Sequence, residues 1–315
     1  MVNKAFPWSP SRLSAYLSCP HAYFLSYLQH EEPTINPAIA LGSAFHAIVK
    51  QNSKAPKDGS RPTFFKSEES FARAWWAQQY WGKHKGDFEE KIFYYYGWIG
   101  VKALLEYWKR NLSQPTYSEF PFKQENIVYR GYRLTGVMDQ VIISSKREIT
   151  IIDLKLSQGN PTSGSWQKWL NRGIQLTIYW YAAQILWRGF PINLLVDHYW
   201  IHEDPETPKD EKTHRGNMIV TRGFYPTTRD ETDLIDLFEI LEFVASGVQT
   251  EQFPHTENSI ACRYCLYAHA CEKGVDENRR AMGMSPLEIV SWEGIVPAKL
   301  PPREPPAKQL RFRWN

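Results

Sequence analysis

Apolar and polar residues repeat with two different periods along the chain, and helical periodicity dominates the first fifty residues. Residues 9–10 (Ser-Pro) have the composition of a helix N-cap followed by proline at the first helical position. They predict a helix that ends at residues 19–20 (Cys-Pro). The spacing of apolar side chains predicts an aromatic helix over residues 21–28 and a further helix over 41–51.

From about residue 120 the period changes to two, which is typical of β-strands. Residues 137–143 and 149–151 form two alternating runs on either side of a polar turn. Helical periodicity returns over 170–187, and a strand is predicted over 194–201. A charged loop separates that strand from a helix predicted over 230–247.

Two stretches lack the pattern of a compact sheet. Residues 52–63 form a polar linker, and 64–112 are helical in pattern and rich in Trp and Tyr. Residues 296–315 contain five prolines, five basic residues and a single acidic residue. This composition predicts an extended, mobile tail, which is either an arm that binds DNA or a partner, or a solvated tail without a role.

Composition narrows the class of protein. With 43% hydrophobic and 23% charged residues, the chain resembles ordinary soluble proteins, and its net charge of +3 disfavours a purely electrostatic nucleic-acid binder. Neither a signal peptide nor an apolar run of about 18 residues is evident, so we expect a cytoplasmic protein that does not enter a membrane. In a reducing cytosol, the four cysteines are expected to be metal ligands rather than disulfides.

The two predicted strands around residue 146 carry a pair of carboxylates. If Ile143 pairs with Ile149 across the five-residue turn, the register places Asp139 opposite Asp153. Because side chains alternate along a strand, both carboxylates and Lys155 then point to one face. A register slip of one residue would move one carboxylate to the other face.

Two opposed carboxylates are unfavourable unless a cation lies between them, because directly opposed Cβ atoms are only about 4.5–5.5 Å apart. Oxygen ligands of this kind suit Mg²⁺ or Mn²⁺. Lys155 can stabilise charge on a phosphate or help to activate a water. The alternative is an exposed hairpin end, in which each aspartate is solvated or paired to a lysine.

Four motifs occur in order along the chain: 42–46 (GSAFH), 136–139 (GVMD), 153–155 (DLK) and 175–179 (QLTIY). Each is common by chance, but together they resemble the RecB-like branch of the PD-(D/E)xK nuclease superfamily. The resemblance implies an α/β, restriction-endonuclease-like fold with a central mixed sheet flanked by helices. It also implies that residues 52–118 are a helical insertion.

The resemblance implies a role for each matching residue. His46 and Asp139 would be metal ligands, and Asp153 would join the metal to the scissile phosphate. Lys155 would be the catalytic lysine, acting with the two aspartates. Glu125, on the strand before the hairpin, is a further candidate carboxylate.

Candidate DNA contacts come from two sources. Gln175 and Tyr179 match the family motif and lie at i and i+4 on one helix face, where they would position DNA or support the metal site. Four other side chains are candidates because basic and aromatic groups bind nucleic-acid strands. They are Arg12, Tyr16, Lys168 and Arg172.

The four cysteines are arranged as one early residue, Cys19, and a late group of Cys262, Cys265 and Cys271. Closely spaced thiolates suit zinc or an iron–sulfur cluster, and the ligands alone do not distinguish them. The arrangement is similar to the iron–sulfur subset of RecB-like nucleases, which includes the AddAB nuclease and the CRISPR adaptation nucleases. That resemblance implies a [4Fe–4S] cluster that staples the N-terminal helix to the domain.

The expected organisation is a single nuclease domain over 1–285, with a cluster segment at 255–275 and a Pro-rich basic tail at 286–315. The expected function is Mg²⁺- or Mn²⁺-dependent hydrolysis of single-stranded DNA from an end, in recombination, repair or processing. The chain has no P-loop motif, so a helicase, CRISPR or recombination protein would be its partner. Alternatives are a structure-specific endonuclease that processes DNA ends, an inactive DNA-binding module and a zinc-stapled scaffold.

Overall fold

The computed structural model describes residues 6–33, 37–53, 103, 117–123, 125–158, 170, 173–204, 206, 218–256, 262 and 265–271. All but the edges and residue 103 of the predicted insertion at 52–118 lie outside these ranges, as does the predicted tail at 286–315. None of the helices within these ranges is long and apolar enough to span a membrane.

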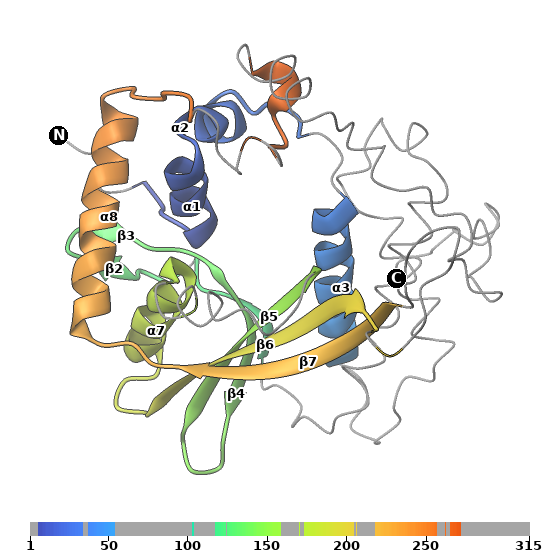
Figure 1. The fold of residues 1–315 in the computed structure, drawn as a ribbon. Coiled ribbons are helices and arrows are strands. Elements are labelled where there is room, and N and C mark those ends of the chain that lie inside the picture. Colours follow the sequence, from blue (N-terminus) through green and yellow to red (C-terminus); the bar gives the residue numbers. More distant parts are fainter. Residues whose placement is uncertain are drawn as a thin grey trace, which may run out of the picture.

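A mixed five-stranded sheet forms the centre of the molecule, in the order β1-β4-β5-β6-β7 (Figure 1). Its strands are β1 (Tyr117–Pro121), β4 (Val137–Ile143), β5 (Ile149–Gln158), β6 (Ile192–Glu203) and β7 (Met218–Thr227). β5 and β6 are parallel, and the other neighbouring strands are antiparallel. The predicted α/β fold with a central mixed sheet is confirmed.

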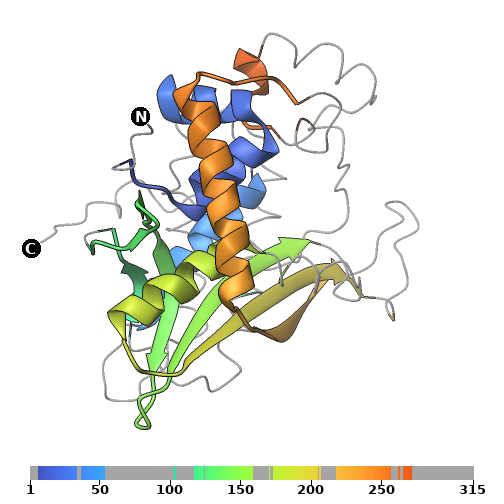
Figure 2. The same ribbon diagram turned by 90° about the vertical axis from the view of Figure 1, so that its left-hand side faces the viewer.

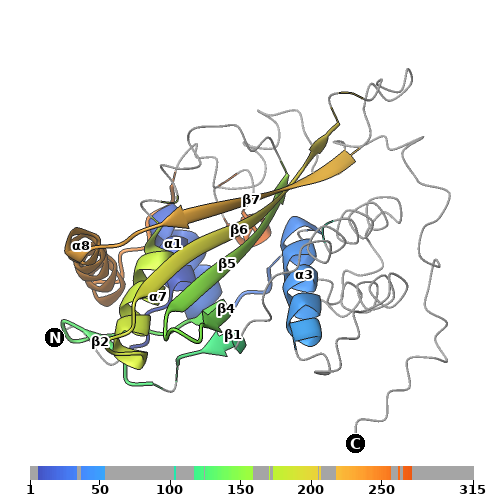
Figure 3. The same ribbon diagram turned by 90° about the horizontal axis from the view of Figure 1, so that it is seen from below.

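Helices cover both faces of this sheet. α1, α7 and α8 lie on one side and α3 lies on the other (Figure 3). These helices are α1 (Pro10–Ser18), α3 (Pro37–Ser53), α7 (Ile174–Leu186) and α8 (Glu231–Gln249). The smaller elements are α2 (Pro20–Tyr23), the π-helix η1 (Phe24–Leu28), the hairpin of β2 (Val128–Tyr129) and β3 (Tyr132–Arg133), and the 3₁₀-helix η3 (Ala268–Ala270).

Local sequence explains where the first helix begins and ends. Ser9 is extended and its side chain accepts a hydrogen bond from the Arg12 backbone N–H at 3.2 Å, with Pro10 at the first helical position. Cys19 is extended, so the chain turns there before α2 starts at Pro20. The predicted helix start at Ser9 and the interruption at Cys19 are confirmed.

The core lies between the sheet, α7, α8 and α1. On α8, the buried side chains Leu234, Leu237, Leu241 and Val244 recur every three or four residues and so form one face. α8 extends from the end of β7 to the region of α2 and η3, alongside α1 (Figure 2). This helix therefore links the sheet to the end of the molecule that carries the cysteines.

The strand β7 was missing from the sequence prediction. Its ten residues include Gly223 and Pro226, which weaken the strand pattern. Within the described sheet, β7 pairs only with β6, and Pro226 lies opposite Leu195 on that side. A proline is tolerated here because an edge strand has backbone groups that need no partner in the sheet.

Candidate active site

The strand register aligns three carboxylates across neighbouring strands. β4 pairs with β5 so that Val141 faces Ile151, and the same register brings Asp139 level with Asp153. This confirms the predicted register of the hairpin. On the other side of β4, the pairs that flank Glu119 of β1 bring Glu119 level with Asp139.

The ladder between β4 and β5 stops at this row. Gln140 and Ile152 are the last matched pair, and the backbone N–H of Leu154 donates instead to the Asp139 side chain, with 2.7 Å from N to Oδ2. One oxygen of Asp139 is thus used to close the sheet. The other oxygen, Oδ1, lies 3.6 Å from Nδ1 of His46.

His46 approaches the carboxylates from α3. Its Nδ1 is 3.4 Å from Oε1 of Glu119, and the ligand atoms of His46, Glu119 and Asp139 all lie within 4.8 Å of one another. The preceding residue, Phe45, is buried against Tyr199 of β6 with ring centroids 5.1 Å apart, which fixes α3 on the sheet. One imidazole and two carboxylates suit a divalent ion such as Mn²⁺ or Mg²⁺.

Glu119 was not among the residues selected from the sequence. Its φ of 52° lies in the left-handed region, where a non-glycine residue is strained, and such residues cluster at functional sites. Glu125, the carboxylate selected instead, is exposed in a turn after β1. The sequence around Glu119 offered only a carboxylate in a short run that ends at Pro121. The pairing of β1 with β4 is what places Glu119 in the site.

Asp153 and Lys155 form an ion pair at the end of the carboxylate row. Lys155 Nζ lies 3.0 Å from each carboxylate oxygen of Asp153, whose side chain is only 2% exposed. Nζ also donates to Oε1 of Gln175, at 3.1 Å. The ammonium group therefore neutralises a buried carboxylate and is held by α7 from the opposite side.

Gln175 and Tyr179 extend this network to the backbone of β4. Gln175 Nε2 donates to the Tyr179 hydroxyl at 2.9 Å, and that hydroxyl donates to the carbonyl of Val137. Gly136 is required beside this bond, because a Cβ there would lie 2.7 Å from the ring of Phe122 and 3.2 Å from that of Tyr179. Tyr179 is buried, so of the two roles expected for it, this placement favours support of the site over contact with DNA.

Burial and charge shift the proton affinities of this site. Burial would lower the pKa of His46, but the carboxylates of Asp139 and Glu119 outweigh it and raise that pKa to about 8. Burial raises the pKa of Asp139; Asp153 raises it further, while His46 and Lys155 oppose the rise. The negative charge gathered at this cluster is therefore suited to binding a cation.

His198 of β6 is a neighbour that sequence analysis did not identify. It lies opposite Lys155 in the parallel pair of β5 and β6, and its Nε2 is 2.6 Å from Oγ of Ser157. Burial, together with the charge of Lys155, lowers the pKa of His198 to about 3. The imidazole is therefore neutral at physiological pH and adds no second positive charge beside Lys155.

The structure favours a packing role for two of the candidate DNA contacts. Tyr16 is buried in the core, where its hydroxyl donates to the carbonyl of Gln252 at 2.7 Å, so its ring is not accessible to a base. Arg12 is half-buried, and its guanidinium lies over the rings of Phe6 and Tyr27, at 4.3 and 5.0 Å from their centroids. Both residues stabilise the N-terminal segment. Lys168 and Arg172 lie outside the described residues.

The four cysteines come together at the far end of α8. Each is half-buried, and none of them forms a disulfide. Burial raises the pKa of the Cys265 thiol, and proximity to Cys19, Cys271 and Cys262 raises it further, while the Tyr267 backbone N–H opposes the rise. Four half-buried thiols gathered in this region suit a metal centre, because a bound cation compensates the mutual repulsion of thiolates.

Direct contacts join the two chain segments that carry these cysteines. The Tyr267 hydroxyl donates to Oγ of Ser26 at 2.9 Å, and the Thr256 hydroxyl donates to the carbonyl of Ser18 at 3.2 Å. The backbone N–H of His21 donates to the carbonyl of Pro254 at 3.3 Å. The region before α3 is thus held against the segment after α8 by the protein itself.

Comparison with known proteins assigns the family. The model of the PD-(D/E)XK nuclease superfamily matches residues 7–272. Among solved structures, a candidate exonuclease from Eubacterium rectale is similar, with 13% identity, a TM-score of 0.47, and 90% of this chain and 95% of that chain covered. The protein SSO0001 is also similar, with 13% identity, a TM-score of 0.32, and 76% of this chain and 96% of that chain covered. None of the curated proteins matches. On the family match, which covers most of its length, the chain belongs to the PD-(D/E)XK nuclease superfamily.

Proposed function

We propose that the chain is a metal-dependent deoxyribonuclease that degrades single-stranded DNA from an end. One observation carries the proposal: Glu119, Asp139 and Asp153 form a row, with His46 beside the first two carboxylates and Lys155 paired to the third. A row of carboxylates beside a lysine suits hydrolysis of a phosphodiester, in which negative charge accumulates on the phosphate oxygens.

His46, Glu119 and Asp139 are the residues that would hold Mg²⁺ or Mn²⁺, and Asp153 lies next along the row. A divalent ion bound there polarises a phosphate oxygen and makes its bound water more acidic. Asp139 can offer only Oδ1, because the N–H of Leu154 occupies Oδ2. His46 must lose its proton before Nδ1 can bind the ion.

Lys155 is the residue that would contact the scissile phosphate. Its Nζ is fixed by Asp153 and Gln175, and its side chain is 27% exposed, so it is accessible from the site. A protonated amine so placed stabilises charge on the phosphate without first having to reorganise. Gln175 and Tyr179 act through Lys155 and Val137, as positioning residues.

Preference for single strands and for ends rests on the resemblance of the four sequence motifs to RecB-like nucleases. Such an enzyme needs a supply of unwound DNA. A separate helicase, or a recombination or CRISPR protein, is the class of partner that would provide it.

We also propose that Cys19, Cys262, Cys265 and Cys271 hold a [4Fe–4S] cluster. The support is the donor set: four half-buried thiols, assembled from two chain segments that hydrogen bonds already hold together. Thiolates in this number are the usual ligands of such clusters. Zinc is the competing occupant.

The test compares two substrates: end-labelled linear single-stranded DNA and circular single-stranded DNA. Each is incubated with anaerobically purified protein, with or without Mn²⁺. Mn²⁺-dependent loss of the linear substrate alone, abolished in Asp153→Ala, would support an end-dependent nuclease. The matched control is Asp236→Ala on the exposed side of α8, which should retain wild-type activity. Cleavage of the circle would overturn end dependence, and equal activity of wild type and Asp153→Ala would overturn the site.

The visible spectrum of the same samples tests the cluster. A broad absorbance at about 400 nm is expected for thiolate-ligated iron, and the protein should contain bound iron and sulfide. Colourless protein that contains zinc would replace the cluster and leave the nuclease site unaffected.

A further inference from the structure

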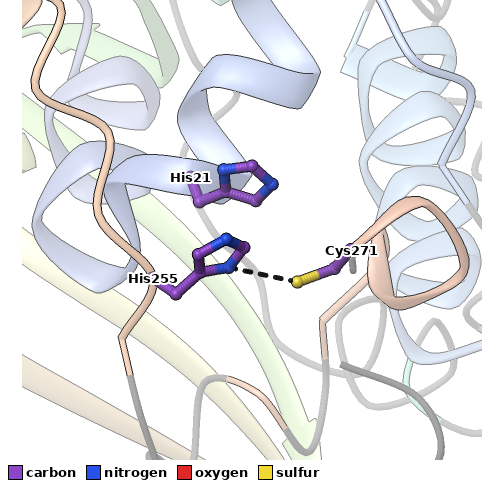
Figure 4. Close-up of side chains that lie close together, drawn as sticks. All are labelled: His21, His255 and Cys271. Atoms are coloured by element: carbon purple, nitrogen blue, oxygen red, sulfur yellow. Dashed lines mark hydrogen bonds between the residues drawn. The ribbon is translucent and has the colours of Figure 1, made fainter. Parts of the chain in front are cut away.

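Two histidines flank one of the four cysteines. Nδ1 of His255 lies 3.4 Å from the sulfur of Cys271, and the ring of His21 stacks on that of His255 with centroids 3.8 Å apart and planes 32° apart (Figure 4). The ligand atoms of all three residues fall within 4.8 Å of one another. The two rings come from segments about 230 residues apart in sequence, so only the fold brings them together.

The ring geometry shows which role these residues can take. Imidazole nitrogens bind a metal along lone pairs that lie in the plane of the ring. The two ring planes are tilted by only 32° with centroids 3.8 Å apart, so their in-plane lone pairs converge too little to meet on one ion close to both rings, and His21 and His255 are badly placed to bind it together. In contrast, Nδ1 of His255 points at sulfur at the distance of an N–H···S hydrogen bond (Figure 4).

We propose that His255 donates its Nδ1 proton to the sulfur of Cys271 and thereby stabilises the iron–sulfur cluster and raises its reduction potential, with His21 holding the imidazole in place. The inference rests on the cluster proposed above. It assigns His255 as a positioning residue of the cluster, and Nδ1 as the protonated ring nitrogen.

The physical reason is charge. A thiolate bound to iron carries negative charge, and reduction of the cluster adds more. A hydrogen bond to the sulfur disperses that charge, so it favours the reduced cluster and strengthens retention of the ligand. Hydrogen bonds to the sulfurs are among the factors that set cluster potentials.

The backbone on either side of His255 is anchored to the segment that carries His21. Pro254 accepts from the backbone N–H of His21 at 3.3 Å, and Thr256 donates its hydroxyl to the carbonyl of Ser18 at 3.2 Å. The ring of His255 is thus fixed by its neighbours along the chain as well as by the stack.

The test compares two substitutions of similar shape in the full chain. In His255→Asn the side-chain amide nitrogen takes nearly the place of Nδ1 and can donate, whereas His255→Leu fills the same space without a donor. Iron and sulfide per chain, the half-life of the visible absorbance in air and the reduction potential are measured for both. We expect the half-life to fall about 10-fold in His255→Leu, with a lower potential, and to stay within about 2-fold of wild type in His255→Asn.

Equal behaviour of Asn and Leu would overturn the proposed hydrogen bond, because shape alone would then account for the effect. Wild-type values in both variants would overturn any role for His255. His21→Phe should preserve the stack and the half-life, and His21→Ala should shorten the half-life; the reverse order would overturn the role of His21. Wild-type protein without iron and sulfide would instead remove the cluster, an outcome visible before any variant is compared.

Discussion

The carboxylate site and the cysteine site are built in opposite ways. In the carboxylate site, Asp139 and Asp153 come from adjacent strands, and Lys155 and Leu154 already neutralise or hydrogen-bond them. In the cysteine site, Cys19 meets Cys262, Cys265 and Cys271 only because the two ends of the domain meet, and the four thiols repel one another as they ionise. The first site is preorganised by the sheet, whereas the second would be stabilised further by a ligand bound to the four thiols.

Because of this difference, we expect that a substitution in one site leaves the other site intact. A change in the carboxylate row should remove activity while the fold persists, because the sheet is formed by backbone pairing. A change in the cysteines should weaken the connection between the N-terminal helices and the segment after α8.

The largest expected effect is on catalysis. Lys155→Met should lower the rate of DNA hydrolysis about 10³-fold, because the charge on the phosphate loses a preorganised donor. Single-turnover kinetics with Mn²⁺ measure the rate, and the visible spectrum should remain that of the wild type. Lys146→Met, in the exposed turn of the same hairpin, is the control. A coupled loss of colour in Lys155→Met would contradict the independence of the two sites.

The reciprocal change is Cys19→Ser. Loss of a staple that closes the loop of 252 residues from Cys19 to Cys271 (271 minus 19) corresponds to about 5–6 kcal/mol of loop-closure free energy. For a domain of this size, that predicts a fall in Tm of about 10 °C. Differential scanning fluorimetry of anaerobic samples measures it, with Ser14→Ala on the exposed side of α1 as the control. An unchanged Tm would mean that protein contacts alone hold the segments together.

The contribution of Glu119 sharpens the definition of the first site. Glu119→Gln removes one charged oxygen ligand and should weaken Mn²⁺ binding about 10- to 100-fold. Glu125→Gln changes the exposed carboxylate in the turn and should leave Mn²⁺ affinity unaltered. Isothermal titration calorimetry distinguishes them. Weaker Mn²⁺ binding in Glu125→Gln but not in Glu119→Gln would instead identify Glu125, the carboxylate predicted from the sequence, as the metal ligand.

Acidity should affect the carboxylate site through His46. Although burial alone would lower its pKa, the neighbouring carboxylates raise it to about 8, so the metal-free imidazole is protonated at pH 7. Since the ion binds only the neutral ring, Mn²⁺ affinity should rise about tenfold per pH unit up to about pH 8 and then level off. Titrations at pH 6, 7, 8 and 9 measure this. Affinity that is constant between pH 7 and 8 would remove His46 from the ligand set.

The smallest effect is expected at the end of the network. Tyr179→Phe removes the hydroxyl that joins Gln175 to Val137, with its two hydrogen bonds, and should lower the hydrolysis rate about 3- to 10-fold, because neither bond touches the reacting phosphate. Gln175→Leu frees Lys155 directly and should be more severe. Tyr181→Phe, two positions further along α7, loses a hydroxyl bond to the distant Val128 carbonyl and is the matched control. Equal hydrolysis rates for Tyr179→Phe and the wild type would mean that Gln175 positions Lys155 without help from Tyr179.

How far the sequence predicted the molecule depended on how local each feature is. The register of β4 and β5 followed from alternation across a short turn, and the start of α1 followed from Ser9 and Pro10. Both features are set by neighbours in sequence. Membership of the nuclease superfamily also followed from the order of short motifs.

The features that were missed depend on distant segments. Glu119 becomes part of the row only when β1 pairs with β4, and His198 only through the parallel pairing of β5 and β6. Tyr16 was selected as a DNA contact because an aromatic ring on a helix gives no sign of burial. α8 determines its environment, where a Cβ at Gly247 would lie 1.9 Å from the Tyr16 hydroxyl.

The distance in sequence between Cys19 and Cys271 also determines when, during biosynthesis, all four cysteines are present. The ribosome must add 252 residues (271 minus 19) after Cys19 before the last of the four thiols exists. At about 5–20 residues per second, this takes about 13–50 s. For that interval, Cys19 is a single thiol on a growing chain, exposed to oxidants and to stray metal ions. A cluster that needs all four thiols could be inserted only when synthesis of the domain is nearly finished.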